Sequence, residues 1–182
     1  MTLTHDHIDE LLLQCKQGKQ RAQLEVYNRY YKAMYNTALR IVKDTAEAED
    51  IMQESFLSAF TKLKDYKGEA TFGSWLKRIV VNNSINSYQK KSRYEEVPLE
   101  TKLHKIEDNS DGLTECDTGD LKVERVINKM NELKPNYRIA LTLHLIEGYD
   151  YEEMSEILNM SYANCRTTVS RAKESLRKKL IK

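Results

Sequence analysis

Hydroxyl and guanidinium side chains recur on one side of the last helix that the sequence predicts. At about 100° per residue, Thr167, Ser170 and Arg171 lie opposite an apolar face, and Arg166 and Arg177 flank them. The apolar face consists of Cys165, Val169, Ala172 and Leu176. Guanidinium groups and hydroxyls donate hydrogen bonds to phosphates and to base edges in a major groove. The pattern suits contact with duplex DNA, although a terminal amphipathic helix can also simply present a charged face to solvent.

A second group of polar side chains combines aromatic rings, amides and cations. Its members are Tyr66, the turn residues Lys67, Gly68 and Glu69, and the amides Asn82, Asn83 and Asn86. Aromatic faces stack on unpaired bases, while amides and cations hydrogen-bond to their edges. The group favours a single-stranded nucleic-acid ligand. Phe72 and Trp75, in the same stretch, are expected to belong to the core.

A third group is acidic and polar and lies within AEDIMQESFLSAF, residues 48–60. Asp50, Gln53 and Glu54 are spaced i, i+3, i+4, so they share one face of a helix. That face is either the solvated side of a core helix or a docking patch for another protein.

Catalytic and metal-binding motifs are lacking. The sequence has no P-loop, nucleophile elbow or HExxH motif, and its four histidines are scattered. The cysteines are odd in number and far apart without a CxxC pair, which disfavours a disulfide framework or a zinc site. They are Cys15, Cys116 and Cys165. We therefore expect no enzyme activity, no cofactor and no metal.

The elements that must position these groups are predicted to be helices. Only six Gly and two Pro interrupt 182 residues, and the apolar residues recur at helical spacing. Helices are expected over about 21–42, 45–63 and 121–133, and from Pro135 to Gly148. Four more are expected: one whose face carries Ile8 to Cys15, and one each after the caps Thr71, Asp150 and Ser161. Thr71, Asp150 with Glu153, and Ser161 are expected N-caps, and Pro135 fits a first helical turn.

One long helix, 21–42, is expected to carry an apolar side. The residues along it are Leu24, Tyr27, Tyr31, Met34, Tyr35 and Ala38. Near the C-terminus, a short helix after Asp150, a turn of about three residues and a longer basic helix form a helix-turn-helix pattern.

Charge divides the chain into three parts. The net charge is +1, but residues 64–94 carry a local +5, 95–120 a local −7 and 161–182 a local +6. The acidic stretch has low hydrophobicity and reads as a flexible linker. We expect two small helical domains, 1–93 and 121–182, joined by an acidic linker at 94–120.

Neither a membrane span nor a secretory signal is recognisable. No run of 18 apolar residues exists, and the first ten residues carry His5, Asp6, His7 and Asp9 where a signal needs a basic and then an apolar stretch. The chain is therefore expected to be cytoplasmic and not inserted in a membrane.

Together these motifs resemble the sigma-70 family of RNA polymerase sigma factors, in its small extracytoplasmic-function branch. AEDIMQESFLSAF resembles region 2.2, DYKGEATFGSWLKRIVVNNSINSYQKK resembles regions 2.3 and 2.4, and 123–180 resembles region 4. The resemblance implies a subunit that directs core polymerase to promoters by recognising −35 and −10 elements and by aiding melting. An anti-sigma factor is implied as a further partner.

The resemblance also implies residue roles. Docking on the clamp helices of the polymerase's largest catalytic subunit is implied for Asp50, Ile51, Gln53, Glu54, Phe56 and Leu57. Contact with the single-stranded −10 element is implied for Tyr66, Lys67, Gly68, Asn82, Asn83, Asn86 and Lys90. Contact with the duplex −35 element is implied for Ser161, Arg166, Thr167, Ser170, Arg171 and Lys173. The acidic stretch matches the linker threaded through the polymerase's nucleic-acid channels.

Several positions depart from the family pattern. Many members have Arg or Lys at Thr168 and a bulkier residue at Ser170, and Asn83, Ser84 and Ser87 replace more usual Ala and Asp-Arg. The promoter sequence therefore stays open. The alternative function is a stand-alone helix-turn-helix transcription regulator, which would bind its operator tightly without polymerase.

Overall fold

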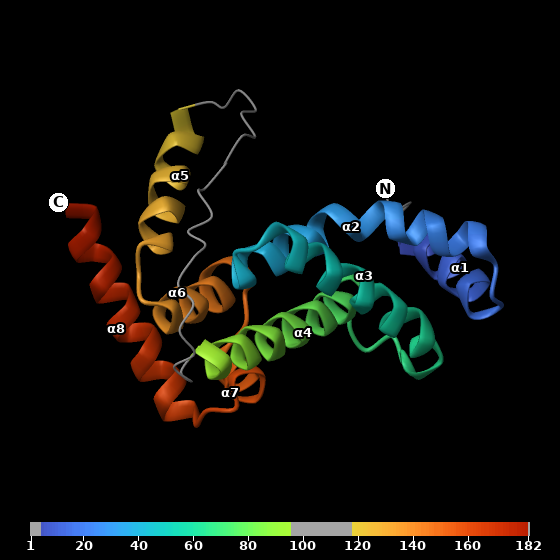
Figure 1. Ribbon diagram of the computed structural model, residues 1–182. Coiled ribbons are helices and arrows are strands. Elements are labelled where there is room, and N and C mark those ends of the chain that lie inside the picture. The colour runs from blue at the N-terminus through green and yellow to red at the C-terminus, as the bar shows by residue number, and fades with distance from the viewer. Residues whose placement is uncertain (1–4, 96–117, 182) are drawn as a thin grey trace. The chain divides into compact units, whose positions relative to one another are not determined.

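The computed structural model describes residues 5–95 and 118–181, and every regular element in these two ranges is a helix (Figure 1). The expected all-α fold is confirmed. Contacts divide the chain into two compact units, Met1–Ser92 and Arg93–Lys182. Most of the predicted acidic linker lies outside the described residues.

The first unit contains four α-helices within its described residues. They are α1 (His5–Lys16), α2 (Gln20–Val42), α3 (Thr45–Thr61) and α4 (Phe72–Glu95), with a 3₁₀ turn, η1 (Leu63–Asp65), after α3. The core side chains include Val26, Ile41, Met52, Phe56, Leu63, Leu76, Val80 and Ile85. α2 packs against both α1 and α3.

Local signals in the sequence explain where these helices begin and end. Lys43 adopts a left-handed conformation with φ 61°, which terminates α2. Asp44 then accepts a hydrogen bond from the Glu47 backbone N–H at 2.9 Å and caps α3. At α4, the Thr71 hydroxyl accepts from the Ser74 backbone N–H at 3.2 Å, as predicted. α2 and α3 are thereby joined by a two-residue connection.

The buried side of α2 differs from the predicted apolar side. Met34 and Ala38 are buried, but Leu24 and Tyr31 are exposed. The buried side is rotated from the predicted one and, besides Met34 and Ala38, carries Val26 and Ile41. α2 has apolar residues around most of its circumference, so periodicity alone cannot decide which side its two neighbours, α1 and α3, cover.

The second unit contains four further α-helices within its described residues. They are α5 (Thr118–Asn131), α6 (Pro135–Leu141), α7 (Tyr151–Leu158) and α8 (Tyr162–Ile181). A π-helical turn, η2 (Thr142–Ile146), extends α6. α6 and α7 both pack on α8, and the core includes Leu141, Leu143, Met154, Cys165 and Val169.

Two predicted caps set the helix-turn-helix geometry. The Asp150 carboxylate accepts from the Glu153 backbone N–H at 2.8 Å, and the Glu153 carboxylate accepts from the Asp150 backbone N–H at 3.0 Å. This reciprocal capping box was predicted and is confirmed. Asn159 adopts a left-handed conformation, φ 51°, and ends α7. Ser161 then caps α8 by accepting from the Asn164 backbone N–H at 3.3 Å.

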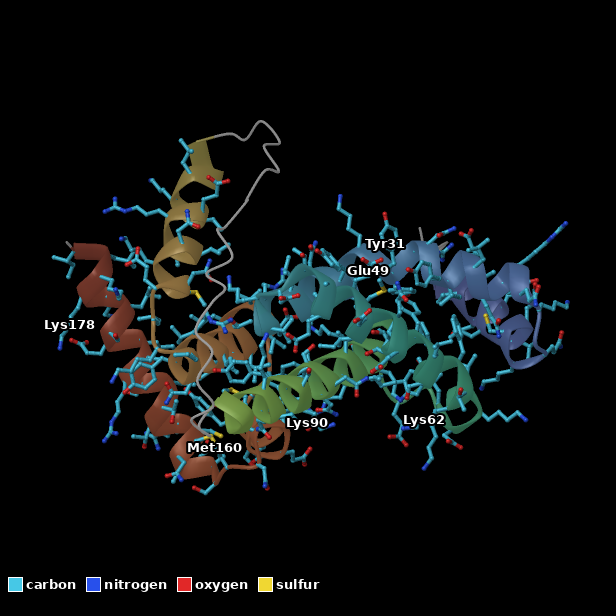
Figure 2. All side chains as sticks on the ribbon, viewed as in Figure 1. Tyr31, Glu49, Lys62, Lys90, Met160 and Lys178 are labelled. Carbon is cyan, nitrogen blue, oxygen red and sulfur yellow. The ribbon has the colours of Figure 1, made fainter. Side chains whose placement is uncertain are left out.

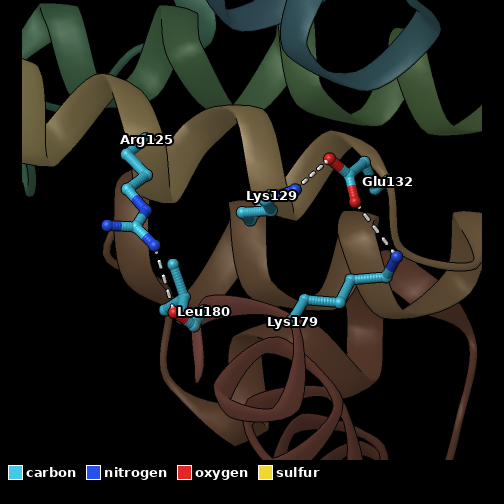
Figure 3. A network of polar contacts seen from close by, with 5 residues as sticks. All are labelled: Arg125, Lys129, Glu132, Lys179 and Leu180. Atoms are coloured by element: carbon cyan, nitrogen blue, oxygen red, sulfur yellow. Dashed lines mark hydrogen bonds and ion pairs between the residues drawn. The ribbon is translucent and has the colours of Figure 1, made fainter. Parts of the chain in front are cut away.

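A polar network fastens α5 to the end of α8 (Figure 3). Lys129 Nζ and Lys179 Nζ donate to the two oxygens of Glu132 at 2.7 and 3.1 Å. Arg125 donates to the Leu180 carbonyl at 3.3 Å, which places a cation at the C-terminal end of a helix, where the dipole favours it. The hydrogen bonds from the two lysines hold the pKa of the Glu132 carboxyl below its usual value.

Candidate nucleic-acid interfaces and docking face

The polar face predicted on α3 is present on the surface. Asp50, Gln53 and Glu54 are exposed, and Leu57, with 69% of its side chain exposed, lies beside them on the same helix. Gln53 Nε2 donates to Glu49 Oε1 at 3.2 Å, which orients the amide along the helix surface. An exposed leucine bordered by carboxylates and an amide is suited to contact a protein partner.

Two other residues predicted for this face have a different place. Ile51 and Phe56 are buried, and the Phe56 ring packs at 4.8 Å from that of Tyr27 on α2. These two side chains support the docking face from beneath and do not form its surface. Burial follows from the helical period, because residues 51 and 56 point away from the side that carries 50, 53, 54 and 57.

The loop between η1 and α4 is closed by the Tyr66 side chain. Its hydroxyl donates to the Ala70 carbonyl at 2.6 Å, and its ring packs 5.2 Å from Trp75 and 5.9 Å from Phe72. Burial raises the pKa of the Tyr66 hydroxyl, and nearby Asp9 and Tyr30 raise it further. Tyr66 therefore stays neutral at physiological pH and can donate this bond.

The loop has exposed residues at its tip. Lys67, Gly68 and Glu69 are exposed, and Gly68 has φ 77°, a conformation that favours glycine. Phe72 is buried, as predicted, and Trp75 is half-buried. The loop thus presents a cation and free backbone on a packed aromatic base.

Three residues predicted for the −10 element form one exposed stripe on α4. Asn82, Asn86 and Lys90 are spaced i, i+4, i+8 and are all exposed. Figure 2 draws the described side chains on the ribbon and labels Lys90 on α4. Two amides and an ammonium in a row can hydrogen-bond to base edges and to a phosphate.

Asn83, predicted for the same site, is instead engaged inside the unit. Its Nδ2 donates to Ser55 Oγ at 2.9 Å, and Ser55 donates to the Ile51 carbonyl at 2.6 Å. One turn later, Ser87 Oγ donates to Glu47 at 2.7 Å, and Lys91 pairs with the same carboxylate at 3.4 Å. We call these five groups, Glu47, Ser55, Asn83, Ser87 and Lys91, the α3–α4 polar seam. The departures at Asn83 and Ser87 thus have a structural role.

The surface of α8 matches the predicted helical wheel. Cys165, Val169, Ala172 and Leu176 are buried, as predicted. On the opposite side a hollow is lined by Tyr162, Ala163, Arg166, Thr167, Ser170 and Arg171. Four of these six were predicted for the −35 element. Thr167 donates its hydroxyl to the Ala163 carbonyl at 2.8 Å, so it offers outward a methyl group and acceptor lone pairs.

A second hollow adjoins the first across Ser170 and Arg171. Its other lining residues are Tyr137, Glu174, Ser175, Arg177 and Lys178. Lys173 is half-buried and lines neither hollow. Tyr162, Ala163 and Tyr137 are lining residues that the sequence analysis missed; the exposed start of α8 was the available signal for the first two.

The thiols are poorly placed for chemistry. Cys15 and Cys165 are buried, and burial raises the pKa of both; Cys116 lies outside the described residues. Among the residues that the structure describes, no three His, Cys, Asp or Glu side chains gather as metal ligands. No helix in the same ranges is long and apolar enough to cross a membrane.

Comparison with known proteins identifies a family and relatives along most of the chain. The family model Sigma-70 region 2 matches residues 26–94, and Sigma-70, region 4 matches 124–176. The ECF RNA polymerase sigma-E factor of Haemophilus influenzae is 28% identical, with 93% of each chain covered. The ECF RNA polymerase sigma factor SigW of Bacillus subtilis is 29% identical, covering 95% of this chain and 96% of the relative.

A solved structure shares the fold. The sigma factor RpoE, in complex with the anti-sigma factor NepR from Bartonella quintana, superposes with a TM-score of 0.60 at 20% identity, covering 86% of this chain and 94% of that chain. Two helical units, the second of which ends in a helix-turn-helix with guanidinium and hydroxyl groups exposed on its last helix, define the class of this protein as a two-part helical protein with a candidate DNA-binding surface. The two region models account for both units, and the chain belongs to the sigma-70 family, in its extracytoplasmic-function branch. This assignment does not favour a stand-alone regulator.

Proposed function

We propose that this sigma factor docks on core RNA polymerase through α3, reads the −35 element with α8 and holds unpaired −10 bases with the Tyr66 loop and α4. The observation that carries the proposal is the α8 surface. Guanidinium and hydroxyl groups line one hollow there, while the opposite side of the same helix is buried. Such a helix can enter a major groove without disturbing its own core.

At −35, Arg166 and Arg171 supply the specific donors. Arg bonds bidentately to O6 and N7 of guanine or to a phosphate, and Ser170 and Thr167 contribute polar atoms between them. Ser161 caps α8 and sets the start of the helix; its hydroxyl and the half-buried Lys173 are assigned to the rim of this interface.

At −10, we assign base contact to the exposed side chains and a positioning role to those that bond within the protein. Lys67 and the Gly68 backbone lie at the loop tip, where a base that leaves the stack needs donors for its edge. Asn82, Asn86 and Lys90 continue this surface along α4. Asn83 contributes through the seam that positions α4, and Tyr66 contributes through the bond that closes the loop.

Docking on the polymerase is assigned to Asp50, Gln53, Glu54 and Leu57. The proposed receptor is the pair of clamp helices of the largest catalytic subunit, with Ile51 and Phe56 packing behind the contact. Carboxylates at the rim fit a basic partner, and Leu57 supplies apolar contact area near the middle.

The remaining assignments follow from the same family membership. We assign residues 1–93 to core docking and −10 recognition, 94–120 to an acidic linker, and 121–182 to −35 binding. The protein is expected to act in the cytoplasm and to catalyse no reaction itself, since synthesis belongs to the polymerase. Because RpoE was solved with the anti-sigma factor NepR, we also propose an anti-sigma factor as partner.

Transcription in a purified system tests this function. The protein is mixed with core polymerase and genomic DNA, and the 5′ ends of the transcripts are sequenced. New start sites that share upstream −35 and −10 elements are expected; transcripts identical to those from core alone would overturn the proposal.

A matched pair of variants tests the docking face. Leu57→Glu should abolish binding to core polymerase, because it places a charge where apolar contact is needed. Leu13→Glu, at an equally exposed leucine of α1 with 58% exposure, should bind core like the wild type. Equal loss, or no loss, in both variants would remove Leu57 from the interface.

A further inference from the structure

The first turn of α8 holds an exposed aromatic side chain that the −35 assignment has not used. Tyr162 is 49% exposed and lines the same hollow as Arg166, Thr167, Ser170 and Arg171. At i−4 from Arg166, it continues the DNA-facing stripe to the very start of the helix. Side chains at the N-terminal end of a recognition helix are the ones that reach base edges.

Two further rings, from the two elements that precede α8, support the Tyr162 ring. Its ring stands edge-on to that of Tyr151 on α7, with centroids 5.8 Å apart and planes at 85°. Tyr151 in turn stacks on His144 of η2 at 4.8 Å and 18°. The Tyr149 carbonyl can only accept, so His144 Nδ1 donates to it at 3.0 Å. The row of rings is therefore held at its far end by the hydrogen bond from His144 to the backbone.

The elements behind these rings are themselves well fixed. The capping box holds the first turn of α7, which carries Tyr151, and Ser161 caps the first turn of α8 beside Tyr162. An aromatic side chain restrained in this way loses little conformational entropy when it meets a ligand. Tyr162 is thus prepared to make a directed contact.

The chemistry of the hollow identifies what such a ring would contact. Arg166 and Arg171 satisfy acceptors, and Thr167 has its donor committed to the Ala163 carbonyl. Tyr162 supplies an extended apolar surface next to these polar groups. In a major groove the apolar feature of the bases is the C5-methyl group of thymine.

We propose that Tyr162 is a specificity-determining residue that packs its ring on a thymine C5-methyl group within the −35 element. This proposal rests on the assignment of α8 to the −35 major groove. Tyr151 and His144 act as positioning residues for the Tyr162 ring.

Single-methyl deletion in the DNA tests the contact directly. Holoenzyme formed with core polymerase is bound to a promoter identified by 5′-end sequencing, with each −35 thymine replaced in turn by deoxyuridine. Loss of one buried methyl group corresponds to a drop in affinity of about three- to fivefold. We expect this drop at one thymine for the wild type and for Tyr162→Phe, and a ratio near one for Tyr162→Ala. Because each ratio compares two DNAs with the same variant, a general loss of stability does not change it.

Three outcomes would overturn the proposal. One is a promoter on which no thymine-to-deoxyuridine change affects the wild type. Another is Tyr162→Ala keeping the full methyl dependence, which would give Tyr162 only a packing role. The third is Tyr162→Phe behaving like Tyr162→Ala, which would show that the ring alone does not provide the methyl dependence. Arg171→Ala on the same DNA distinguishes failure of the Tyr162 proposal from failure of the proposed function. If Arg171→Ala also leaves the −35 sequence preference intact, the assignment of α8 to the −35 element is wrong as well.

Discussion

Some polar side chains of this sigma factor are exposed and free to contact a ligand, and others bond within the protein and position their neighbours. Asn82 and Asn83 are neighbours in sequence, yet one amide is exposed and the other donates to Ser55. Tyr66 keeps its ring on Phe72 and Trp75 and uses its hydroxyl within its own loop. What each residue contributes therefore depends on whether its side chain points to solvent or into the protein, as well as on its type.

Removing the Tyr66 hydroxyl should weaken promoter melting. Tyr66→Phe keeps the ring contacts but loses the bond to Ala70, worth about 0.5–1.5 kcal/mol net. Permanganate reactivity of the −10 thymines should fall by a few-fold, with closed-complex binding nearly intact, and Tyr66→Ala should fall further. Unchanged melting in both variants would show that the loop does not depend on this side chain.

Arg171 should contribute sequence preference at −35. Arg171→Ala should cost about 1–3 kcal/mol of binding by the holoenzyme on cognate DNA and relax the preference for one base pair. Arg177→Ala is the control, since its guanidinium lies 3.7 Å from the Glu174 carboxylate and lines only the second hollow. Equal losses on cognate and scrambled −35 elements would make Arg171 a phosphate contact.

At the scale of the helices, polar contacts add to the apolar packing. Because hydrogen bonds are directional, they help to fix how one helix is rotated against its neighbour. The α3–α4 polar seam joins α3, the proposed docking helix, to α4, which carries the exposed stripe of Asn82, Asn86 and Lys90. In the second unit, Glu132 joins α5 to the end of α8 through two lysines. The bonds from Asn83 to Ser55, from Ser87 to Glu47 and from Lys179 to Glu132 each connect different elements.

The seam can be tested by exchanging neighbouring asparagines for alanine. Asn83→Ala should lower the free energy of unfolding of the first unit by about 1 kcal/mol, since a partly buried bond is lost. Asn82→Ala should change that stability by less than about 0.5 kcal/mol while reducing −10 melting more strongly. Denaturant unfolding and permanganate footprinting of both variants check this; the reverse order would exchange the two roles.

The Glu132 network should make the α5–α8 contact sensitive to acid. The pKa of Glu132 is lowered in the folded protein, so its stabilising effect is present above the ordinary pKa of a glutamate and is lost as the pH falls through the folded value. The difference in Tm between wild type and Glu132→Gln should be largest near neutral pH and vanish in acid. It should also shrink in high salt, because the carboxylate is exposed. A difference independent of pH would exclude a charge effect.

As a whole molecule, the protein consists of two compact units, over which we propose that promoter recognition is divided. Each unit offers a small surface, and two linked sites bind tightly only when both are engaged at once. Core polymerase, the proposed partner of the α3 face, is the component that we expect to bring both units onto one promoter.

Free protein should therefore bind duplex promoter weakly. In a mobility-shift titration, half-saturation should require at least about tenfold more protein without core polymerase than with it, at one fixed salt concentration. Glu54→Lys should remove the effect of core without altering the weak binding of the free protein. Tight, salt-resistant operator binding by the free protein would instead favour a stand-alone regulator.

Much of this architecture could be predicted because its signals are local. Thr71, Asp150, Glu153, Pro135 and Ser161 act within one helical turn of themselves, and all five occupy the predicted positions. The buried face of α8 follows from helical period alone, because that helix has one clear apolar side. A cap or a period needs no knowledge of distant residues.

Other features depend on which elements meet. The burial of Val26 rather than Leu24 on α2, the bond from Asn83 to Ser55, and the ring chain from His144 to Tyr162 all join residues that only the packed fold brings together. The sequence by itself determined which segments are helices, the caps at Thr71, Asp150 and Ser161, and the family of the protein. The tertiary structure decided which polar and aromatic side chains face outward, because that choice depends on contacts between different elements, which a local sequence signal does not specify.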